Sequence, residues 1–306
     1  MPASFHIIGI FGRVKNPGVI ETLKTLTTYL KKLNREILIE AETASAIDDA
    51  SFLSVSREEL CKRCQLIIVV GGDGSLLHAS HAVVNNEIPV LGVNRGRLGF
   101  LTDIHPTEFD KIKAILDGDY ILEKRFLLTA TVHHHGKILG ENNALNEVAL
   151  IPDLVPHMSE FEIYINNQFV CSQNSDGFIV ATPTGSTAYA LSGGGPILHP
   201  SLNAIVIVPM FPHTLSMRPI VLDGSHEVTI VITPNNTTTH RLTCDGQAAI
   251  NTPLGSQITI RKKTQKLHLI HPKDYDYYET LRSKLHWGHK LQYYVNSNSH
   301  PPFGNH

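Results

Sequence analysis

A carboxylate stands inside a glycine-rich turn at Asp73, in the sequence Gly71-Gly72-Asp73-Gly74. Glycine allows backbone conformations with positive φ and a close approach to a ligand, and the N-terminus of a following helix would offer free N–H groups to phosphate. A carboxylate in such a turn can orient a hydroxyl group and accept its proton. Gly and Asp are also ordinary turn residues, so the pattern equally fits a plain strand-to-helix connection. Because the turn has neither the Walker spacing nor the dinucleotide fingerprint, its meaning depends on the rest of the chain.

Three further polar stretches could complete a site around Asp73. Asn146 and Glu147 combine an amide with a carboxylate at the start of an expected strand, where they could receive hydroxyls and ring nitrogens. Asp176 lies in a second tight turn, and Thr182–Pro196 is a run of hydroxyls and glycines that offers a plausible nucleotide-binding surface. The first pair could also be a simple turn, and the run a flexible linker. Because apolar stretches bracket the run, we expect an ordered loop.

Several cations could bind phosphate beside these turns, namely Arg13, Lys15, Arg95 and Arg97. Each could equally be a solvated surface cation, and the sequence does not rank the four. The three histidines at 133–135 invite a metal-binding interpretation. Side chains of a strand alternate between its two faces, so three consecutive histidines cannot converge on one ion. We expect a solvated strand end there, and no metal site built from protein side chains.

The elements expected around Asp73 alternate between strands and helices over the first hundred residues. Leu66–Val70 is an apolar, mostly β-branched strand that runs into the glycine turn, and Ser75 is placed to cap a helix over 76–85. Pro89–Val93 predicts a further strand, followed by a turn rich in glycine and arginine. The alternation predicts a parallel sheet with helices on its faces, with both turns beside one crevice at the carboxyl ends of the strands.

The composition changes near Arg125. From 126 to 270, short alternating or β-branched runs are separated by turn signals, which predicts a β-rich, β-sandwich-like domain. We therefore assign 1–125 to an α/β domain and 126–270 to the β-rich domain. A helix after Ile270 is expected to return to the first domain and complete it over 271–295. The tail 296–306, rich in Asn, Ser and Pro, is expected to be disordered.

The overall composition is that of an ordinary globular protein, with 42% hydrophobic and 18% charged residues and a formal net charge of -2. The near-neutral charge gives no electrostatic footprint for nucleic acid or an acidic membrane, so a small-molecule substrate is expected. No apolar run is long enough to span a bilayer, and the N-terminus carries no targeting signal, which favours a cytoplasmic protein. Cys61 and Cys64 form a CxxC without a second pair, so we interpret all four cysteines as structural thiols.

The polar motifs together resemble a known family. The match comprises GGDG at 71–74, NRGRLGFLTD at 94–103, the Asn-Glu pair at 146–147, SDG at 175–177, TPTGSTAYALSGGGPI at 182–197, PMFPHTLSMRP at 209–219 and CDGQ at 244–247. With these motifs the chain resembles the bacterial NAD kinases from about Ile7 to about Leu291. The long Thr/Gly/Ser block with GGDG and the Asn-Glu pair is highly specific, whereas GGDG alone also occurs in lipid kinases.

The resemblance implies transfer of the ATP γ-phosphate to the 2′-hydroxyl of the adenosine ribose of NAD, which gives NADP and ADP. Asp73 would be the general base, and Mg²⁺ or Mn²⁺ would be carried mostly by the ATP phosphates. The family implies a homo-oligomer, often a tetramer, with NAD sites completed across subunits. The residues that would bind the cofactor are Asp73, Gly74, Asn146, Glu147, His157, Asn174, Asp176, Thr184, Thr187, Ala188, Tyr189, Ala190, Leu191, Ser192, Phe211 and Gln247.

Two alternatives belong to other functional classes: a small-molecule or lipid kinase that shares the GGDG turn, and a non-catalytic NAD-binding sensor. The sequence contains no basic amphipathic helix for a membrane surface, which disfavours a lipid substrate. A sensor would be expected to have lost Asp73. The chain departs from some relatives at Asn174, where they carry a basic residue, and from many at Glu147, where Asp is common.

Overall fold

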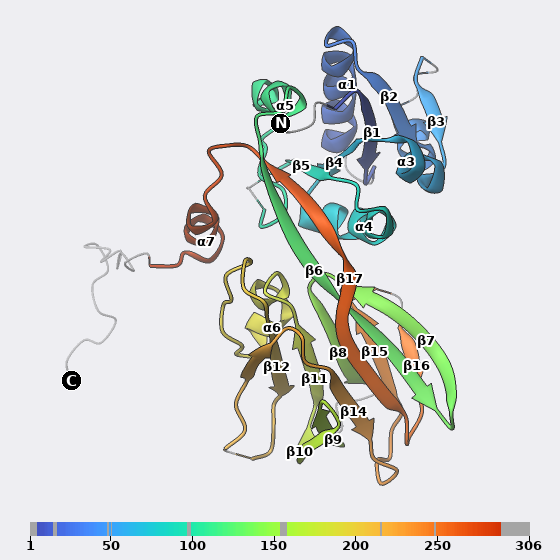
Figure 1. Ribbon diagram of the computed structural model, residues 1–306, viewed down its shortest axis with the longest axis vertical. Helices are drawn as coiled ribbons and strands as arrows, with labels where there is room; N and C mark the ends of the chain where they lie inside the picture. Colours follow the sequence, from blue (N-terminus) through green and yellow to red (C-terminus); the bar gives the residue numbers. More distant parts are fainter. Residues whose placement is uncertain are drawn as a thin grey trace, which may run out of the picture.

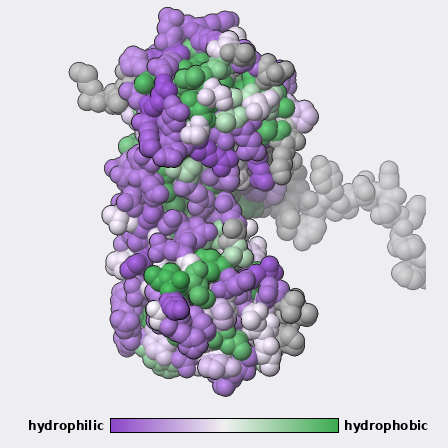
Figure 2. Space-filling view, turned by 90° about the vertical axis from the view of Figure 1, so that its right-hand side faces the viewer, coloured by the Kyte–Doolittle hydropathy of each residue, from purple (hydrophilic) through white to green (hydrophobic). Residues whose placement is uncertain are grey.

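The computed structural model describes residues 5–14, 17–47, 49, 51–96, 99–153, 158–214, 216–247 and 249–288. An α/β region and a β-rich region lie end to end along the long axis, joined by two long strands (Figure 1). The face seen in Figure 2 is mostly hydrophilic, with a hydrophobic patch on each of the two regions. Within the described residues, no helix combines the length and apolar character needed to cross a membrane.

The α/β region contains the predicted parallel sheet, in the order β5-β4-β1-β2-β3. Its strands are β1 (Ile7–Gly12), β2 (Glu36–Glu40), β3 (Leu53–Val55), β4 (Leu66–Gly71) and β5 (Val90–Asn94). Its helices are α1 (Pro17–Lys32), α2 (Ala41–Ile47), α3 (Arg57–Arg63), α4 (Asp73–Val83) with the 3₁₀ turn η1 (Val84–Asn86), and α5 (Phe109–Leu116).

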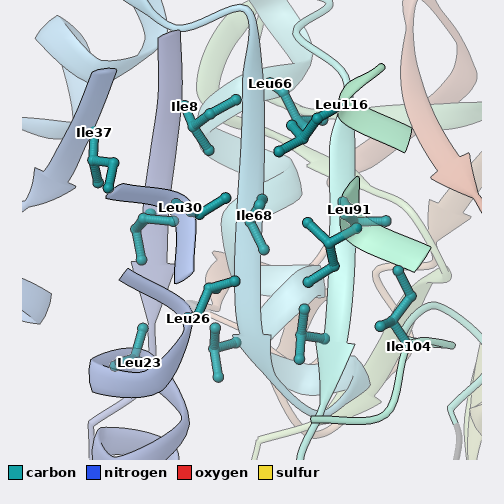
Figure 3. Close-up of a cluster of buried hydrophobic side chains, with 14 of the residues drawn as sticks. Ile8, Leu23, Leu26, Leu30, Ile37, Leu66, Ile68, Leu91, Ile104 and Leu116 are labelled. Atoms are coloured by element: carbon teal, nitrogen blue, oxygen red, sulfur yellow. The ribbon is translucent and has the colours of Figure 1, made fainter. Parts of the chain in front are cut away.

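Hydrophobic side chains cover both faces of this sheet, as expected for parallel strands. On one face α1 buries Leu23, Leu26 and Leu30, spaced at three and four residues, against strand residues such as Ile8 and Ile68 (Figure 3). The other face is covered by residues of α3 and α4. Every residue of β4 is buried, so the strand that leads into the glycine turn is held in place from both sides.

The structure corrects the sequence-based account of the helix after the glycine turn. Ser75 is not its cap: α4 begins at Asp73, and Gly72 is the N-cap without any side-chain cap hydrogen bond. Ser75 is buried and points back at Gly71, where a Cβ atom would lie 2.3 Å from its Oγ. The helix ends at Val83 rather than at residue 85, because the chain tightens into η1. Two short elements, α2 and β3, were not predicted.

The long strands β6 (Ile121–His134) and β17 (Gln257–His271) join the two regions (Figure 1). They pair antiparallel with one another along most of their length. One end of β17 pairs parallel with β5, and the other end pairs antiparallel with β14 (Val228–Ile232). The sheet is therefore continuous through both regions, with 11 strands. The predicted domain boundary after Arg125 lies within β6.

The β-rich region is a sandwich, as predicted. One layer is formed by β6 and β17 together with β7 (Lys137–Ala144), β9 (Ser159–Ile165), β10 (Gln168–Ser175) and β14. The second is an antiparallel sheet of β13 (Ile220–Asp223), β12 (Ala204–Met210), β11 (Gly177–Ala181), β8 (Glu147–Pro152), β15 (His240–Cys244) and β16 (Ile250–Thr252). The core between them contains Phe161, Phe178, Leu128 and Leu150.

After β17 the chain forms the helix α7 (Tyr277–Leu285), in the predicted place. Tyr277 lies against Phe100 of the α/β region, with ring centroids 6.5 Å apart, and against His199 of the β-rich region, at 5.0 Å. The helix therefore contacts the first region as predicted, and the second as well. All four cysteines are free. The predicted tail at 296–306 lies outside the described residues.

Candidate functional site

The glycine turn after β4 holds Asp73 against the turn after β5. Asp73 Oδ1 accepts hydrogen bonds from Leu101 N (3.0 Å) and Thr102 Oγ1 (3.1 Å), and Oδ2 accepts one from Phe100 N (2.9 Å). Gly99 leaves room for this contact, because a Cβ atom there would lie 1.9 Å from Asp73 Oδ1. The two turns predicted to share a crevice do meet, since β4 and β5 are parallel neighbours.

The hydrogen bonds to Asp73 leave part of its carboxylate available. An ionised carboxylate has about four lone-pair positions, two on each oxygen. Among the described residues, Oδ1 accepts two hydrogen bonds and Oδ2 accepts one. Asp73 is half-buried, while Gly72 and Gly74 on either side of it are exposed. Oδ2 can therefore accept one further hydrogen bond from a ligand.

A second aspartate, Asp245, organises the Asn146-Glu147 turn and was not among the predicted site residues. Its Oδ1 accepts from Asn146 N (2.7 Å) and Glu147 N (3.2 Å), and its Oδ2 accepts from Leu145 N (2.8 Å). His81 Nε2 lies 2.8 Å from the same Oδ2. The CDGQ motif contains Asp245, but only the fold reveals which backbone groups it binds.

The hydroxyl-rich loop after β11 packs directly on this turn, and it is ordered as predicted. It contains the 3₁₀ turn η2 (Gly185–Thr187) and the short helix α6 (Tyr189–Ser192). Thr182 donates from N and from Oγ1 to the carbonyls of Asn146 (2.8 Å) and Leu145 (2.5 Å). Gly185 passes so close that a Cβ atom would lie 2.1 Å from Asn146 O. The loop, the Asn146-Glu147 turn and Asp245 thus form one rigid unit.

Glu147 is buried within this unit and has an unusual protonation equilibrium. Burial, and then the charge of Asp245, raise the pKa of Glu147 to about 7, against a hydrogen bond from Tyr189 N that lowers it. Among the described residues, Glu147 Oε2 has no hydrogen-bond partner. Such an atom has acceptor capacity that a ligand hydroxyl could satisfy.

Helix α4 connects the two aspartate turns. Asp73 is its first residue, and His81, two turns later, contacts Asp245. A cavity of about 500 Å³ extends along this helix between the two regions. It is lined by Gly74, Leu77 and His78 of α4, by Phe11, Gly12, Arg13, Val14, Glu40, Glu42 and Arg57 of the α/β region, and by Asp245, Gly246 and Gln247.

The structure separates the four cations that the sequence left unranked. Arg13 lines the cavity, whereas Arg95 pairs with Glu21 (3.2 Å), which does not line it. Lys15 and Arg97 lie outside the described residues. A cation that the sequence did not single out, Arg57, also lines the cavity.

Arg57 is held in place by Glu40 (3.0 Å) and Glu42 (3.2 Å), and its Nη1 lies 3.0 Å from His78 Nε2. Burial, and then the charges of Arg57 and Arg13, lower the pKa of His78. Arg13 and Arg57 therefore lie on the wall of the cavity beside an uncapped helix N-terminus, and the carboxylates of Glu40 and Glu42, which also line it, offset the charge of Arg57.

Comparison with known proteins decides the family. The model of the ATP-NAD kinase N-terminal domain matches residues 8–120, and that of the C-terminal domain matches 145–272. An NAD kinase of Coxiella burnetii (strain RSA 493 / Nine Mile phase I) is 53% identical over 284 residues, 93% of this chain and 95% of that protein. The chain belongs to the ATP-NAD kinase family. An NAD kinase of Pseudomonas syringae pv. syringae (strain B728a) is 52% identical over 288 residues, 94% of this chain and 97% of that protein.

Solved structures of the ATP-NAD kinase fold agree with the architecture. A yeast NADH kinase complexed with NADH superposes with a TM-score of 0.86 and 24% identity, covering 96% of this chain and 90% of that chain. An NAD kinase from Archaeoglobus fulgidus in complex with ATP gives a TM-score of 0.67 at 24% identity, covering 87% and 94%. The predicted arrangement of a parallel sheet, a β-rich region and a C-terminal helix is thereby confirmed as the NAD kinase fold.

In this ATP-NAD kinase family member, the residues implied by the resemblance fall into separate groups. Gly74 and Gln247 line the first cavity. Tyr189, Ser192 and Phe211 line a second cavity of about 470 Å³ beside α6. The remaining loop positions differ in exposure: Thr184 and Ala190 are buried, and Thr187, Ala188 and Leu191 are half-buried. The side chain of Ala190 packs in a hydrophobic cluster, so only its backbone could face a ligand.

Asn174 and Asp176 are not brought to Asp73 within one chain. Asp176 precedes β11 and Thr182 follows it, so the two lie at opposite ends of this strand. At about 3.3 Å per residue, that separation is roughly 20 Å. Asn174 is exposed at the end of β10, on the same side as Asp176. His157 lies outside the described residues.

Proposed function

We infer that this chain transfers the γ-phosphoryl group of ATP to the 2′-hydroxyl of the adenosine ribose of NAD, giving NADP and ADP. One observation supports this function at the site. Asp73 has a free acceptor position on Oδ2 and lies at the start of α4. Two turns along the same helix, His81 contacts Asp245, which binds the backbone of Asn146 and Glu147. The proposal places the acceptor hydroxyl at Asp73 and the dinucleotide on the unit that carries Asn146 and Glu147.

Asp73 orients the ribose hydroxyl and accepts its proton. Three donors from the turn after β5 fix the carboxylate, so little reorganisation is needed when the hydroxyl attacks phosphorus. In a loose phosphoryl-transfer transition state the nucleophile needs little deprotonation early, so orientation is the larger part of the contribution. Oδ2 is the oxygen that takes the proton, because Oδ1 already accepts two hydrogen bonds.

The cavity along α4 holds the ATP phosphates. Arg13 supplies positive charge, and Gly74 lies at the uncapped start of α4, where backbone N–H groups suit phosphate oxygens. Arg57 also lines the cavity, with its charge shared by Glu40 and Glu42. No group of three or more metal-binding side chains occurs among the described residues, so a divalent ion would arrive mainly on the phosphates, with Asp73 beside it. When bound there, Mg²⁺ or Mn²⁺ would supply positive charge against the charge that develops on the transferred group.

The unit formed by the loop after β11, the Asn146-Glu147 turn and Asp245 selects NAD. Asn146 and Glu147 receive the adenine and ribose, since a carboxylate pairs well with ribose hydroxyls, and the half-exposed ring of Tyr189 can stack on a base. Thr184, Thr187, Ala188, Leu191, Ser192 and the backbone of Ala190 frame the same pocket. Gln247 contributes from the first cavity and Phe211 from the second.

Asn174 and Asp176 reach the nicotinamide half of NAD from another subunit. They lie roughly 20 Å from Thr182, at the other end of β11. At that distance, Asp176 and Thr182 of one chain would not both contact the same ribose of NAD. This separation supports a homo-oligomer whose sites are completed across subunits, and we propose a tetramer. Mixing two inactive variants, Asp73→Asn and Asp176→Ala, would then restore part of the activity through sites built from one intact half of each. No recovery after subunit exchange would argue for sites within single chains.

The deciding experiment for the function is direct. Purified protein is incubated with NAD, ATP and Mg²⁺, and NADP is followed with an NADP-specific dehydrogenase. We expect NADP to accumulate with ATP and not with a non-hydrolysable ATP analogue. Folded protein that binds NAD but forms no NADP above a mock preparation would favour an NAD-binding sensor instead.

A further inference from the structure

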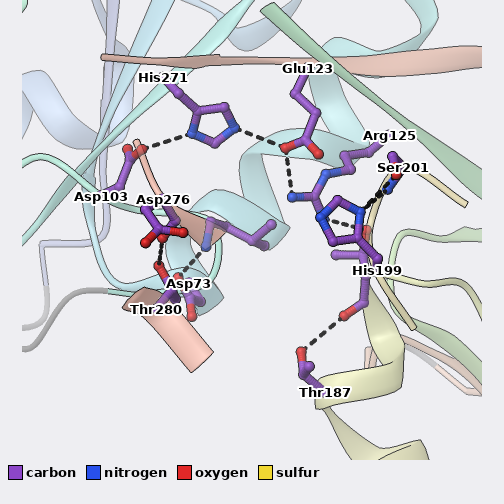
Figure 4. Close-up of polar contacts among 12 residues, drawn as sticks. Asp73, Asp103, Glu123, Arg125, Thr187, His199, Ser201, His271, Asp276 and Thr280 are labelled. Carbon is purple, nitrogen blue, oxygen red and sulfur yellow. Dashed lines mark hydrogen bonds and ion pairs between the residues drawn. The ribbon is translucent and has the colours of Figure 1, made fainter. Parts of the chain in front are cut away.

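A chain of charged groups runs through the base of the site, centred on His271 at the end of β17. His271 is 1% exposed. Its Nδ1 lies 2.7 Å from Asp103 Oδ2, and its Nε2 lies 3.0 Å from Glu123 Oε2 (Figure 4). Glu123 Oε2 also accepts from Arg125 Nη2 at 2.7 Å. Two carboxylates therefore alternate with two cations in a largely buried row.

The geometry fixes the protonation state of His271. Ionised carboxylates only accept hydrogen bonds, and a neutral imidazole has a single N–H donor. With both carboxylates ionised, contacts of 2.7 and 3.0 Å are hydrogen bonds only when each ring nitrogen carries a hydrogen, so this geometry points to an imidazolium. Burial alone would lower the pKa of His271, but the hydrogen bonds and charges of Asp103 and Glu123 outweigh it and the pKa is raised.

The groups that face the ring come from three elements. Asp103 belongs to the turn after β5, and Glu123 and Arg125 belong to β6. Tyr275, from the segment before α7, stacks on the ring with centroids 4.0 Å apart and planes at 14°. Burial raises the pKa of Glu123, but its bonds to His271 and Arg125 prevail and hold that pKa at about 2.

One end of the row is connected to the turn that binds Asp73, and the other end to the loop after β11. Asp103 directly follows Thr102, whose Oγ1 donates to Asp73. At the other end, Arg125 Nη1 donates to Thr184 Oγ1 at 3.1 Å, and Thr184 O accepts from Thr187 Oγ1 at 3.2 Å. The row thus connects the turn that fixes Asp73 with the loop that carries the dinucleotide-binding hydroxyls (Figure 4).

We propose that His271 is a positioning residue for phosphoryl transfer. As a cation, it holds the turn carrying Phe100 to Thr102 and the loop carrying Thr184 in fixed positions relative to one another. The role rests on the proposed function, although His271 itself touches no substrate. Loss of the ring proton would leave one donor for two carboxylates, so Asp103 or Glu123 would turn away. Because Asp103 follows Thr102 in the chain, a shift of Asp103 would also displace Thr102 and its hydrogen bond to Asp73. A small misplacement of a reacting group lowers the rate strongly.

The protonation state can be measured without any turnover. In protein labelled with ¹⁵N-histidine, we expect both ring nitrogens of His271 to carry protons at pH 7 and the ring to titrate above the usual histidine range. The signal is assigned by its loss in His271→Gln or, should that variant not fold, by its displacement in Asp103→Asn. A neutral His271 ring at pH 7 overturns the proposal, whether or not the protein makes NADP.

The kinetic test uses the pH profile of kcat. His271→Gln should lower kcat about tenfold at pH 7 while the KM for ATP changes less than about twofold. Wild-type kcat should fall at alkaline pH as His271 deprotonates, and that limb should be absent in His271→Gln. Asp103→Asn keeps the shape of the side chain but removes its negative charge. The fall of kcat at alkaline pH should therefore move to lower pH by about one unit.

A matched control is His240→Gln. His240 is also buried, with Nε2 2.7 Å from Ser159 Oγ, and lies at the opposite end of β15 from Asp245. Burial lowers the pKa of His240 to about 4, so the ring is neutral at the pH of the assay. This variant should keep the wild-type pH profile. If His271→Gln and Asp103→Asn also keep it, with unchanged kcat, His271 serves folding alone and the proposal is wrong.

Discussion

Among the turns that place an aspartate before a glycine, those at Asp73 and Asp245 both belong to the candidate site, and the two aspartates differ in what their oxygens can still do. Asp73 is half-buried, and its Oδ2 accepts one hydrogen bond from the described residues. The Asp245 side chain is 0% exposed, and each of its oxygens takes two contacts, from three backbone N–H groups and His81. The same residue pair thus gives one carboxylate that can receive a substrate and one that the fold already uses in full.

Helix α4 makes this difference useful. Asp73 begins the helix and His81 leaves it two turns later, so the helix holds the open carboxylate at a fixed distance from the saturated one. Asp245 in turn fixes the backbone of Asn146 and Glu147. In the proposed site, the second aspartate therefore positions the groups assigned to NAD binding, and the first is assigned to the reacting hydroxyl.

The difference between the two aspartates implies that Asp73, and not Asp245, is the reactive carboxylate. Asp73→Asn is nearly isosteric and should lower kcat by about 10³-fold, because the amide cannot take the hydroxyl proton. NAD affinity, measured by calorimetry, should change less than about threefold, since Asn146 and Glu147 are untouched. Turnover within a few-fold of wild type would make Asp73 a turn residue only.

Asp245→Asn should damage stability more than any other single change at the site. Four groups point at its carboxylate, so an amide NH₂ must face a donor inside a buried position. We expect the free energy of unfolding to fall by about 3 kcal/mol in urea titrations. His81→Ala, the matched control, removes one of the four contacts and should cost only about 1 kcal/mol. Equal losses would mean that Asp245 mainly ties the helix to the second region, and not the Asn146-Glu147 turn.

The sequence could predict the elements but not this division of roles. Alternating apolar strands and helices predicted the parallel sheet, because β4 and its neighbours carry uninterrupted apolar runs. The elements α2 and β3 were missed because seven and three residues are too short for a periodic pattern. Ser75 fits the cap preference, yet tertiary packing placed the helix start three residues earlier than predicted.

Polar contacts were the least predictable part. Asp245 and His81 are 164 residues apart in the chain, and His271 and Asp103 are 168 apart. Neither pair has a local signature, because each depends on how β17, β15 and α4 come together. The residue types in the motifs indicated candidate groups for the site, and the fold determined which carboxylate keeps a free acceptor position.

Glu147 makes the stability of the fold depend on pH, in part through the charge of Asp245. The Glu147 pKa of about 7 exceeds the ordinary value of 4.5 because of burial and then the charge of Asp245. Between these two values the folded protein retains a proton that the unfolded chain has lost. The contribution to stability is therefore full below pH 4.5 and is lost as pH rises through 7, by up to about 3 kcal/mol.

Glu147→Gln removes the titrating group while keeping an acceptor for Tyr189 N. We expect the variant to be less stable than wild type near pH 4.5, or equal to it, and to gain relative to wild type by up to about 3 kcal/mol by pH 8. Denaturant titrations at several pH values measure this difference. In the Asp245→Asn background the gain should be smaller, because one cause of the raised pKa is gone. An unchanged gain there would show that burial alone sets the pKa of Glu147, and that the saturated carboxylate acts on its neighbour through the backbone and not through its charge.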